Sequence, residues 1–359
     1  MATRIAIIGG FLGAGKTTLL TKLATDLTRS GKKVGIITND QGEVLVDTQY
    51  ARALGLPVAE VLRGCFCCRF DEFIQSARWL AVDQRPDLIL AEPVGSCTDL
   101  MATVVYPLQS IYREEFEVAP FIVLVDASAL LEDGMPDTTT LNGYLRNHQI
   151  EEAEVVLLSK SDAVPPKRMV GLMDAVRSLN PHAKVIPYSS VSGEGFDLVK
   201  EAVLTQRRTD RPVADIDYDK YAKAEAELGW YNGTFRMQLP ERTDTYDIAL
   251  KIMGYVSSQY GDDDIAHVKL LLASEKNAIK MNLVRRSVNV DGVRESRYGE
   301  GETTLTLNAR VVSEPQRLAQ IMRDAVKVAL DAPRVEVTSV EDTAFSPGRP
   351  NPTHRMAGP

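Results

Sequence analysis

Long apolar runs are absent from this chain of 359 residues. No stretch approaches the roughly 18 consecutive apolar residues that a membrane-spanning helix needs. The short run Ile5–Ile8 leads into glycines rather than into a signal-peptide cleavage site. An excess of positive charge is also missing, because the formal net charge is −8, and this argues against a broad nucleic-acid-binding surface. We therefore expect a cytoplasmic protein that binds neither a membrane nor nucleic acid.

Cysteine is scarce, with four residues in the whole chain. Three of them crowd into the segment Cys65-Phe66-Cys67-Cys68, and the fourth is Cys97. In a reducing compartment cysteines are more often thiols or metal ligands than disulfides. The scarcity therefore argues against a disulfide scaffold and draws attention to the one place where thiols gather.

The first 205 residues alternate short apolar runs with amphipathic stretches of helical spacing. The predicted strands are Arg4–Ile8, Val34–Thr38, Asp87–Ala91, Phe121–Val125, Val155–Leu158 and Lys184–Pro187. The predicted helices include Thr17–Thr28, Phe70–Val82, Lys167–Leu179 and Phe196–Thr205. This alternation predicts an α/β domain over residues 1–205, with a mostly parallel sheet and helices on both faces.

The second part of the chain has a different texture. Residues 206–217 are rich in charge, include Pro212 and break the pattern, which indicates a linker. Beyond them we expect strands at Gly233–Leu239, His267–Ser274, Ala278–Val284, Thr303–Ala309 and Val335–Ser339, and helices at Thr243–Tyr260 and Glu314–Leu330. Clustered strands with two helices predict a smaller α+β domain over residues 218–340. Residues 341–359 carry four prolines and are expected to be irregular.

A phosphate-binding loop is the strongest motif. Gly10-Phe-Leu-Gly-Ala-Gly-Lys16-Thr17 matches G-x-x-x-x-G-K-[ST], with a predicted strand before it and a predicted helix after it. Its glycines let the backbone N–H groups face phosphate oxygens, and the following helix adds its N-terminal dipole. Lys16 is placed to neutralise the β- and γ-phosphates, and Thr17 offers a hydroxyl to Mg²⁺.

An acidic residue at the end of a neighbouring strand is also needed, to hold the Mg²⁺ and its water. Two strands end suitably, at Glu92 and at Asp126. Glu92 is favoured because a glycine, Gly95, follows it three residues later and could sense a γ-phosphate through its N–H. The competing interpretation of either acid is a helix N-cap or a turn.

The next motif points to a guanine base. GTPases read guanine with N-K-x-D, and this chain has Ser159-Lys160-Ser161-Asp162 after a predicted strand. Asp162 would accept hydrogen bonds from the guanine edge, and the stem of Lys160 would lie along the ring. A serine turn at Ser189 followed by Gly-Glu-Gly strengthens the match, whereas Ser159 in place of asparagine weakens it. The alternative is a solvated loop.

The thiol segment is the most distinctive feature. Three thiols in four residues can converge on a soft cation such as Zn²⁺, Co²⁺, Ni²⁺ or Cu⁺. Buried structural cysteines are the alternative, but adjacent Cys67 and Cys68 would point to different sides of a strand. For Cys97, packing and metal binding stay equally open.

Taken together, these motifs resemble the CobW-type GTPases, which belong with the UreG and HypB types to a class of metallochaperone and metalloenzyme-assembly P-loop GTPases. The resemblance covers about the first 205 residues and rests on the phosphate loop, on C-x-C-C at Cys65–Cys68, on E-x-x-G at Glu92–Gly95 and on [NS]-K-x-D at Ser159–Asp162. The family's N-E-x-G-E segment is matched by Asn39-Asp40-Gln41-Gly42-Glu43. By itself that segment is typical of a plain turn, and only the resemblance implies that Asp40 and Glu43 contact metal.

The resemblance implies slow GTP hydrolysis, loading of a transition metal, Zn²⁺ or Co²⁺ first, and its delivery to a client metalloenzyme or corrinoid protein. It departs in one respect, because this chain has four scattered histidines and no histidine-rich stretch. The expected catalytic residues are Lys16, Thr17 and Glu92. The expected GTP-binding residues are Gly10, Gly13, Ala14, Gly15, Lys16, Thr17, Thr18, Gly95, Lys160, Asp162 and Ser189. The expected ligands of Mg²⁺ or the transition metal are Thr17, Asp40, Glu43, Cys65, Cys67, Cys68 and Glu92.

Two other functions stay open at this point. One is a GTP-regulated partner-binding protein in which zinc at the cysteines is structural. The other is a P-loop small-molecule kinase, against which the guanine signals at Ser159–Asp162 and Ser189–Gly195 count. The sequence does not name the client, and a homodimer is one of the assemblies left open.

Overall fold

The computed structural model describes residues 2–39, 46–53, 55–62, 64–209, 213–275, 277–294, 296–331 and 335–358. The chain forms two compact units. The first consists of Met1–Gln41, Ala51–Ala224 and Arg349–Pro359, and the second of Gly42–Tyr50 and Glu225–Gly348. In the described part of the chain, no helix has the length and apolar character needed to span a membrane.

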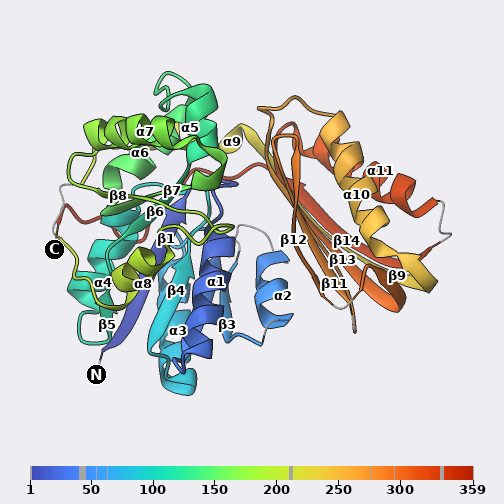
Figure 1. The fold of residues 1–359 in the computed structure, drawn as a ribbon, viewed down its shortest axis with the longest axis horizontal. Helices are drawn as coiled ribbons and strands as arrows, with labels where there is room; N and C mark the ends of the chain where they lie inside the picture. Colours follow the sequence, from blue (N-terminus) through green and yellow to red (C-terminus); the bar gives the residue numbers. More distant parts are fainter. Residues whose placement is uncertain are drawn as a thin grey trace. The chain divides into compact units, whose positions relative to one another are not determined.

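The first unit is built on an eight-stranded sheet whose strand pairs, over the described residues, are all parallel (Figure 1). Its main order is β3-β2-β4-β1-β6-β7-β8, and β5 also pairs with β1. The strands are β1 (Thr3–Gly10), β2 (Val34–Asn39), β3 (Val58–Val61), β4 (Leu88–Glu92), β5 (Phe116–Val118), β6 (Ile122–Asp126), β7 (Val155–Ser159) and β8 (Lys184–Pro187). The predicted α/β fold is confirmed. The sequence pattern did not indicate β3 and β5, which are 4 and 3 residues long.

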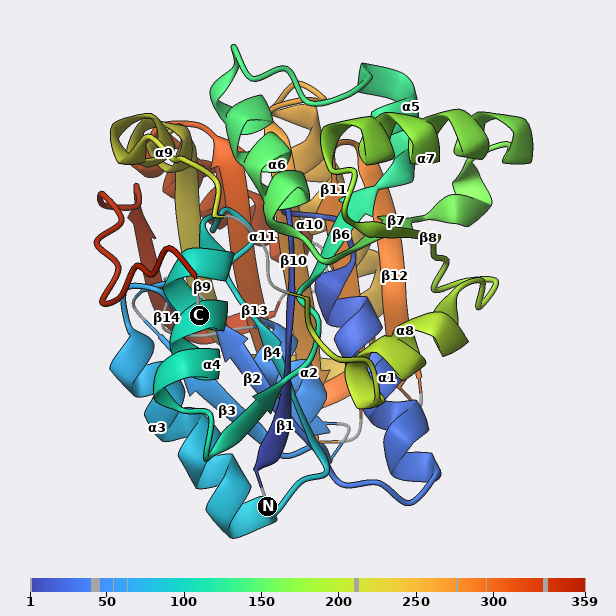
Figure 2. The same cartoon turned by 90° about the vertical axis from the view of Figure 1, so that its left-hand side faces the viewer.

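Helices cover both faces of this sheet, as predicted. They are α1 (Lys16–Arg29), α3 (Phe70–Trp79), α4 (Tyr106–Ile111), α5 (Ala127–Asp133), α6 (Leu141–Glu152), α7 (Pro166–Leu179) and α8 (Phe196–Leu204). A further helix, α9 (Tyr218–Ala226), packs against α6. Apolar residues of α1 and α8 share a core with Ala6 and Ile8 of β1. The alternate residues Ile5 and Ile7 are also fully buried, because α3, α4 and α6 cover the opposite face (Figure 2).

Three helical segments depart from α geometry. The predicted helix Phe70–Val82 is α-helical to Trp79 and continues as a π-helix, Leu80–Gln84. A second π-helix, Met101–Val105, leads into α4. A short 3₁₀ turn, Ser161–Ala163, follows β7. π-helical turns are rare and often lie near functional sites.

The second unit is an antiparallel sheet of six strands in the order β12-β11-β10-β13-β9-β14. Its elements are β9 (Leu228–Asp244), α10 (Thr245–Ser258), β10 (Ile265–Ser274), β11 (Ala278–Val284), β12 (Ser287–Arg294), β13 (Tyr298–Val312), α11 (Pro315–Asp331) and β14 (Glu336–Phe345). Apolar residues of α10 and α11 share one large core with β9, β10, β11 and β13. The separate α+β arrangement was predicted, but β12 was not. A further helix, α2 (Val46–Ala53), contributes Val46 to a small cluster with Leu271 and Ala278 of this sheet.

The chain returns to the first unit after β14. The backbone N–H of Thr353 donates to the Cys67 carbonyl at 2.8 Å, and that of Met356 donates to the Ala102 carbonyl at 3.0 Å. We call residues 349–358 the C-terminal strap. It has no regular secondary structure, yet it is held by named contacts.

Candidate functional site

The phosphate loop lies between β1 and α1, and glycine is required in it. Gly10, Gly13 and Gly15 have φ angles of 129°, 78° and 93°, where other residues are strained. A Cβ atom on Gly10 would lie 2.3 Å from the Leu124 carbonyl oxygen. The ammonium of Lys16, itself largely buried, donates to the carbonyls of Gly10 at 2.8 Å and Phe11 at 3.1 Å. The lysine charge therefore sits at the mouth of the loop.

Thr17 and Glu92 meet beside this loop. The Thr17 hydroxyl donates to Glu92 Oε1 at 3.0 Å, although the two residues lie 75 positions apart. β4 neighbours β1 in the sheet, so the end of β4 delivers the carboxylate next to the first turn of α1. A hydroxyl and a carboxylate in contact are hard oxygen donors of the kind Mg²⁺ takes. The residues present therefore fit a magnesium ion.

Gly95 lies against the same lysine. A Cβ atom on Gly95 would be 3.0 Å from Lys16 Nζ and 2.6 Å from Leu12 Cδ2. The backbone between Glu92 and Gly95 thus approaches the phosphate loop more closely than a side chain would permit. A peptide N–H in this position is suited to read the presence of a terminal phosphate.

Asp126, the other acid considered from the sequence, has a different role. Its side chain caps α5 by accepting from the N–H groups of Ser128 at 3.0 Å and Ala129 at 3.2 Å. It also pairs with Lys160 at 2.5 Å. Burial by itself would raise the pKa of Asp126, but the Lys160 charge and the hydrogen bonds hold it below its usual value. The N-cap alternative therefore describes Asp126.

The segment expected to read guanine forms one polar cluster. Lys160 adopts a left-handed φ of 57°, and its side chain reaches Asp126. The Ser189 hydroxyl donates to Asp162 Oδ1 at 2.5 Å, so the two predicted base-contacting residues are neighbours. Ser159, which stands where asparagine is usual, is buried and donates its hydroxyl to the Val125 carbonyl at 3.2 Å.

The thiol segment is the loop between β3 and α3. The Sγ atom of Cys65 lies 2.7 Å from that of Cys67 and 3.2 Å from that of Cys68, and the last two are 3.7 Å apart. A tetrahedral ion with bonds of about 2.3 Å holds its sulfurs roughly 3.8 Å apart, so small side-chain rotations open the cluster to that spacing. In the described part of the chain, these three thiols are the one place where three or more possible metal ligands from cysteine, histidine or acidic side chains lie close together.

Several backbone features fix this loop. The N–H groups of Cys68 and Arg69 both donate to the Cys65 carbonyl, at 3.0 and 2.9 Å. Asn39, at the end of β2, donates to the carbonyls of Val61 and Gly64 and accepts from the Phe66 N–H at 2.9 Å. The loop also runs into the N-terminus of α3, whose dipole favours negative charge there. No motif in the sequence predicts this role of Asn39.

Proton loss is unequal within the cluster. Hydrogen bonds from the Cys67, Cys68 and Cys97 thiols lower the pKa of Cys65 well below its ordinary value, because they stabilise its thiolate. The hydrogen bond between Cys65 and Cys67 is the largest cause that raises the pKa of Cys67. The separate hydrogen bond between Cys65 and Cys68 is the largest cause that raises the pKa of Cys68 to about 12. One thiol of the cluster therefore loses its proton readily, whereas the other two resist deprotonation. This is expected where a bound metal ion displaces the second and third protons.

The remaining predicted residues fall as follows. Ala14 is buried within the loop, and Thr18 lies in the first turn of α1. Asp40 and Glu43 lie outside the described residues. Cys97, whose role the sequence left open, is buried next to the thiol segment.

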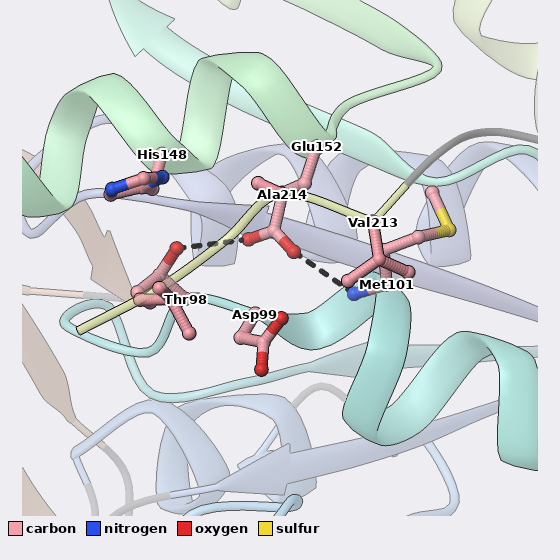
Figure 3. Close-up of a pocket in the computed structure, with 8 residues that line it drawn as sticks. Thr98, Asp99, Met101, His148, Glu152, Val213 and Ala214 are labelled. Carbon is pink, nitrogen blue, oxygen red and sulfur yellow. Dashed lines mark hydrogen bonds between the residues drawn. The ribbon is translucent and has the colours of Figure 1, made fainter. Parts of the chain in front are cut away.

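A small pocket is lined in part by the loop that follows Glu92 (Figure 3). Its lining includes Thr98, Asp99, His148 and Glu152. Glu152 accepts from the Met101 N–H at 2.9 Å and from the Thr98 hydroxyl at 3.3 Å. Burial is the largest cause that raises the pKa of Glu152 to about 8. This carboxyl therefore links α6 to the loop that follows Glu92.

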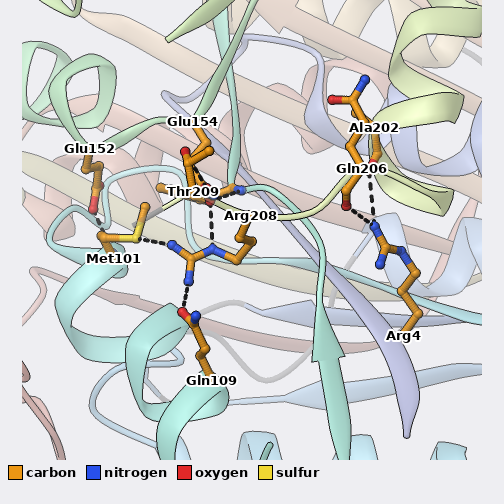
Figure 4. Close-up of polar contacts among 10 residues, drawn as sticks. Arg4, Met101, Gln109, Glu152, Glu154, Ala202, Gln206, Arg208 and Thr209 are labelled. Carbon is orange, nitrogen blue, oxygen red and sulfur yellow. Dashed lines mark hydrogen bonds and ion pairs between the residues drawn. The ribbon is translucent and has the colours of Figure 1, made fainter. Parts of the chain in front are cut away.

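A buried ion pair lies on the same side of the first unit (Figure 4). Arg208 Nε is 2.7 Å from Glu154 Oε2, and the two side chains are 4% and 3% exposed. Glu154 also accepts from the backbone N–H groups of Phe121 and Thr209. Arg208 in turn stacks on the ring of Tyr106. The charged segment 206–209 is therefore fastened to the first unit.

Comparison with known proteins agrees with this geometry. Residues 4–187, just over half of the chain, match the family described as CobW/HypB/UreG, nucleotide-binding domain. The chain is 28% identical over 259 residues to "Zinc chaperone CobW" of Sinorhizobium sp, covering 62% of this chain and 72% of that protein. It is 25% identical over 237 residues to "Zinc-regulated GTPase metalloprotein activator 1" of Dictyostelium discoideum, covering 55% of this chain and 49% of that protein.

Among solved structures, the Zn(II)-bound YjiA GTPase from E. coli aligns with 93% of this chain and 99% of that chain. The sequence identity is 15% and the TM-score 0.40. The chain spans about half the length of several curated relatives, including "Zinc chaperone YjiA" of E. coli (strain K12), of which it covers 49% at 28% identity.

Proposed function

The chain belongs to the CobW/HypB/UreG family, and from this premise we propose that it is a GTPase that holds zinc at Cys65, Cys67 and Cys68 and passes it to a client metalloprotein. The observation that carries the proposal is that a phosphate loop, an E-x-x-G loop and a cluster of three thiols all lie at the carboxyl ends of β1, β4 and β3. In open parallel sheets this edge is where ligands bind.

The hydrolytic end works by positioning and electrostatics. Lys16 and the loop N–H groups neutralise the charge that builds on the transferring phosphate. Thr17 and Glu92 would hold Mg²⁺, which would neutralise negative charge on the phosphates. The Gly95 N–H contacts the terminal phosphate of bound GTP. Hydrolysis removes that phosphate, and the loop after β4 then loses this contact.

The base end selects guanine. The Asp162 carboxylate accepts from the guanine N1–H and amino groups, and Ser189 holds that carboxylate in place. Lys160, fixed by Asp126, lays its stem along the ring. Ser159 stands where an asparagine is usual, and its hydroxyl still links β7 to β6 by donating to the Val125 carbonyl.

The cargo end uses soft sulfur ligands, which favour Zn²⁺ and also accept Co²⁺. The recipient we propose is a metalloprotein, with corrinoid enzymes one class of client to examine. Free thiols fit a reducing compartment, and we place this activity in the cytoplasm.

Exchanging Asp162 for asparagine tests the nucleotide assignment. Xanthine carries a carbonyl oxygen where guanine carries its amino group, so an amide donor should accept xanthosine triphosphate and lose GTP. We expect Asp162→Asn to reverse the preference in a hydrolysis assay with both nucleotides. The matched control is Asp174→Asn, at an exposed carboxylate that pairs with Arg177 in the same helix. An unchanged GTP preference in Asp162→Asn would remove the base assignment.

Metal analysis tests the cargo assignment. Purified protein should bind one Zn²⁺ per chain, and its affinity should differ between GDP and a non-hydrolysable GTP analogue, since coupling between sites is reciprocal. Equal affinity in both states would favour a structural zinc and a GTP-regulated docking protein instead.

A further inference from the structure

The C-terminal strap borders the most accessible of the three clustered thiols. Cys65 and Cys67 are buried, whereas Cys68 is only partly buried. The backbone N–H of Asn351 donates to the Cys68 sulfur, and the Thr353 N–H donates to the Cys67 carbonyl. The strap therefore lies along the side of the thiol segment that is nearest to solvent, which is the side from which a metal ion enters or leaves.

The strap lies on the first unit in the manner of an extended peptide. From residue 350 to residue 357, buried or half-buried residues alternate with exposed ones, which is the period of two that an extended chain shows on a surface. The inward positions are Pro350, Pro352, His354 and Met356. Extended peptides bind with backbone hydrogen bonds for affinity and alternate side chains for specificity. The strap therefore makes the contacts of a bound ligand rather than those of a core segment.

A second set of contacts fastens the strap to the loop that follows β4. Arg355 Nε donates to Asp99 Oδ2 at 2.8 Å, and the Asp99 side chain is 2% exposed. The Tyr218 hydroxyl donates to the same carboxylate oxygen at 2.7 Å. Next to this pair, the Met356 N–H donates to the Ala102 carbonyl. We call the ion pair of Arg355 and Asp99 the latch, because it joins the strap to a buried charge of the first unit.

The loop that carries Asp99 also approaches the phosphate site. A Cβ atom on Gly95 would lie 3.0 Å from Lys16 Nζ. Gln149 Nε2, itself buried, donates to the carbonyls of Gly95 at 3.0 Å and Cys97 at 2.9 Å. One amide therefore holds this stretch together, and Asp99 follows Cys97 by two residues. A displacement of the loop at Gly95 is passed on to the latch.

The strap needs little free energy to open. Its described residues form no helix or strand, and every second side chain faces solvent. Segments with exposed backbone and few buried apolar contacts open at a small part of the global free energy of unfolding. The strap is therefore able to leave the thiol segment while the sheet of the first unit stays folded.

We propose that the C-terminal strap is a cover over the metal-binding thiols, held closed by the latch, and that the metal exchanges when the latch opens. This inference rests on the proposed function. With the strap closed, the metal on the thiol segment is screened from competing ligands. When the terminal phosphate leaves Gly95, the loop after β4 shifts, the latch weakens, and ligands of the client reach the metal.

The rate of metal release from the full-length protein tests the cover. Zn²⁺-loaded protein is mixed with excess chromogenic chelator in a stopped-flow instrument. Arg355→Ala should speed the transfer by about tenfold, the factor that corresponds to one hydrogen bond between charged groups. The control is Arg349→Ala, in the same strap, because Arg349 pairs with Asp219, whose side chain is 76% exposed. Equal rates in Arg355→Ala and unmutated protein would overturn the inference.

A cover is distinguished from a metal ligand by its effect on both rates. Opening the latch should speed Zn²⁺ binding as well as release, so the affinity should change much less than either rate. A second variant, Asp99→Asn, removes the other half of the latch, and asparagine tolerates the left-handed φ of 62° at this position. The double variant should be no faster than Arg355→Ala, because both changes remove one contact. Additive effects, or faster release without faster binding, would contradict the latch. Far-UV circular dichroism and GDP binding check that each variant is folded.

The effect of the nucleotide on these rates tests what controls the latch. In unmutated protein, Zn²⁺ transfer should be faster with GDP than with a non-hydrolysable GTP analogue. The two rates should become nearly equal in Arg355→Ala and should stay different in Arg349→Ala. A difference that survives in Arg355→Ala would contradict control through the latch. Failure of unmutated protein to bind Zn²⁺ would overturn the proposed function as well, whereas Zn²⁺ binding without these rate changes would overturn this inference alone.

Discussion

The backbone N–H of Asn351 donates a hydrogen bond to the Sγ atom of Cys68, 3.2 Å away, across 283 positions of the chain. The neighbouring Thr353 N–H binds the Cys67 carbonyl, and the ring of His354 packs edge-on against Phe70 at 5.0 Å. The C-terminal strap therefore covers the thiol segment from one side and gives one of its sulfurs a hydrogen-bond donor. This donor lowers the pKa of Cys68 against the larger effects that raise it.

Replacing Asn351 by proline should weaken metal binding. Proline has no N–H, and residue 351 already precedes Pro352, which favours the extended backbone that proline needs. A hydrogen bond to a charged group contributes about 1.5 kcal/mol, or roughly tenfold in affinity. Competition against a chromogenic chelator measures the loss. Asn351→Ala keeps the N–H and should bind Zn²⁺ like the unmutated protein, and equal affinity of the two variants would refute this role of the strap.

Glu92→Gln should slow GTP hydrolysis while GTP still binds. The amide keeps the size of the side chain and can still accept from Thr17, but it removes the negative charge that suits Mg²⁺. We expect kcat to fall by about 100-fold, the scale of losing one preorganised electrostatic contact. The control is Asp87→Asn, at the other end of the same strand, where the carboxylate accepts from the Lys33 N–H. Similar kcat values in the two variants would argue against Glu92 as the carboxylate that holds Mg²⁺.

Arg208→Ala should destabilise the first unit. It leaves the buried carboxylate of Glu154 without its cation, which typically costs about 3–5 kcal/mol. Urea unfolding, followed by circular dichroism, measures the free energy of unfolding. Exposed Arg207 is the control, and Arg207→Ala should change it by less than about 0.5 kcal/mol. Adding Glu154→Gln to Arg208→Ala should restore part of the loss, and no recovery would show that packing rather than charge dominates.

Glu152 should make stability fall as pH rises. The folded protein keeps its proton up to about pH 8, whereas the unfolded chain releases it near the ordinary value of 4.5. The contribution is therefore complete below pH 4.5, declines by about 1.4 kcal/mol per pH unit above it, and levels off beyond pH 8. Glu152→Gln should remove this slope. Between pH 5.5 and 8.5, the free energy of unfolding of the variant should therefore rise relative to that of the unmutated protein. Parallel pH profiles in urea unfolding would contradict the shift.

The parts of the site that lie close together in sequence could be predicted. The phosphate loop is eight consecutive residues between two recognisable elements, and its glycines have the positive φ angles that the motif requires. Strands buried on both faces appear as continuous apolar runs, so most of the parallel sheet was visible. Strands of three or four residues, β3 and β5, carry too few side chains to show a pattern.

Contacts between distant segments could not be predicted. The contact between Thr17 and Glu92 depends on β4 lying next to β1, and strand order leaves no periodicity in the sequence. The charges of residues 206–217 indicate a solvated segment, but Arg208 is buried because Glu154 is already inside. The proline-rich end was expected to be irregular, and its irregular backbone still docks through N–H groups whose presence no side-chain pattern reveals.

During synthesis, the thiol segment is made well before the C-terminal strap that contacts it. Cys68 leaves the ribosome 283 residues before Asn351, and at about 5–20 residues per second this is a delay of roughly 15–60 seconds. Throughout that time the nascent Cys68 lacks its hydrogen-bond donor, and residues 225–348 of the second unit are being made. Capture of a metal ion by the newborn chain and capture by the finished protein are therefore different chemical events.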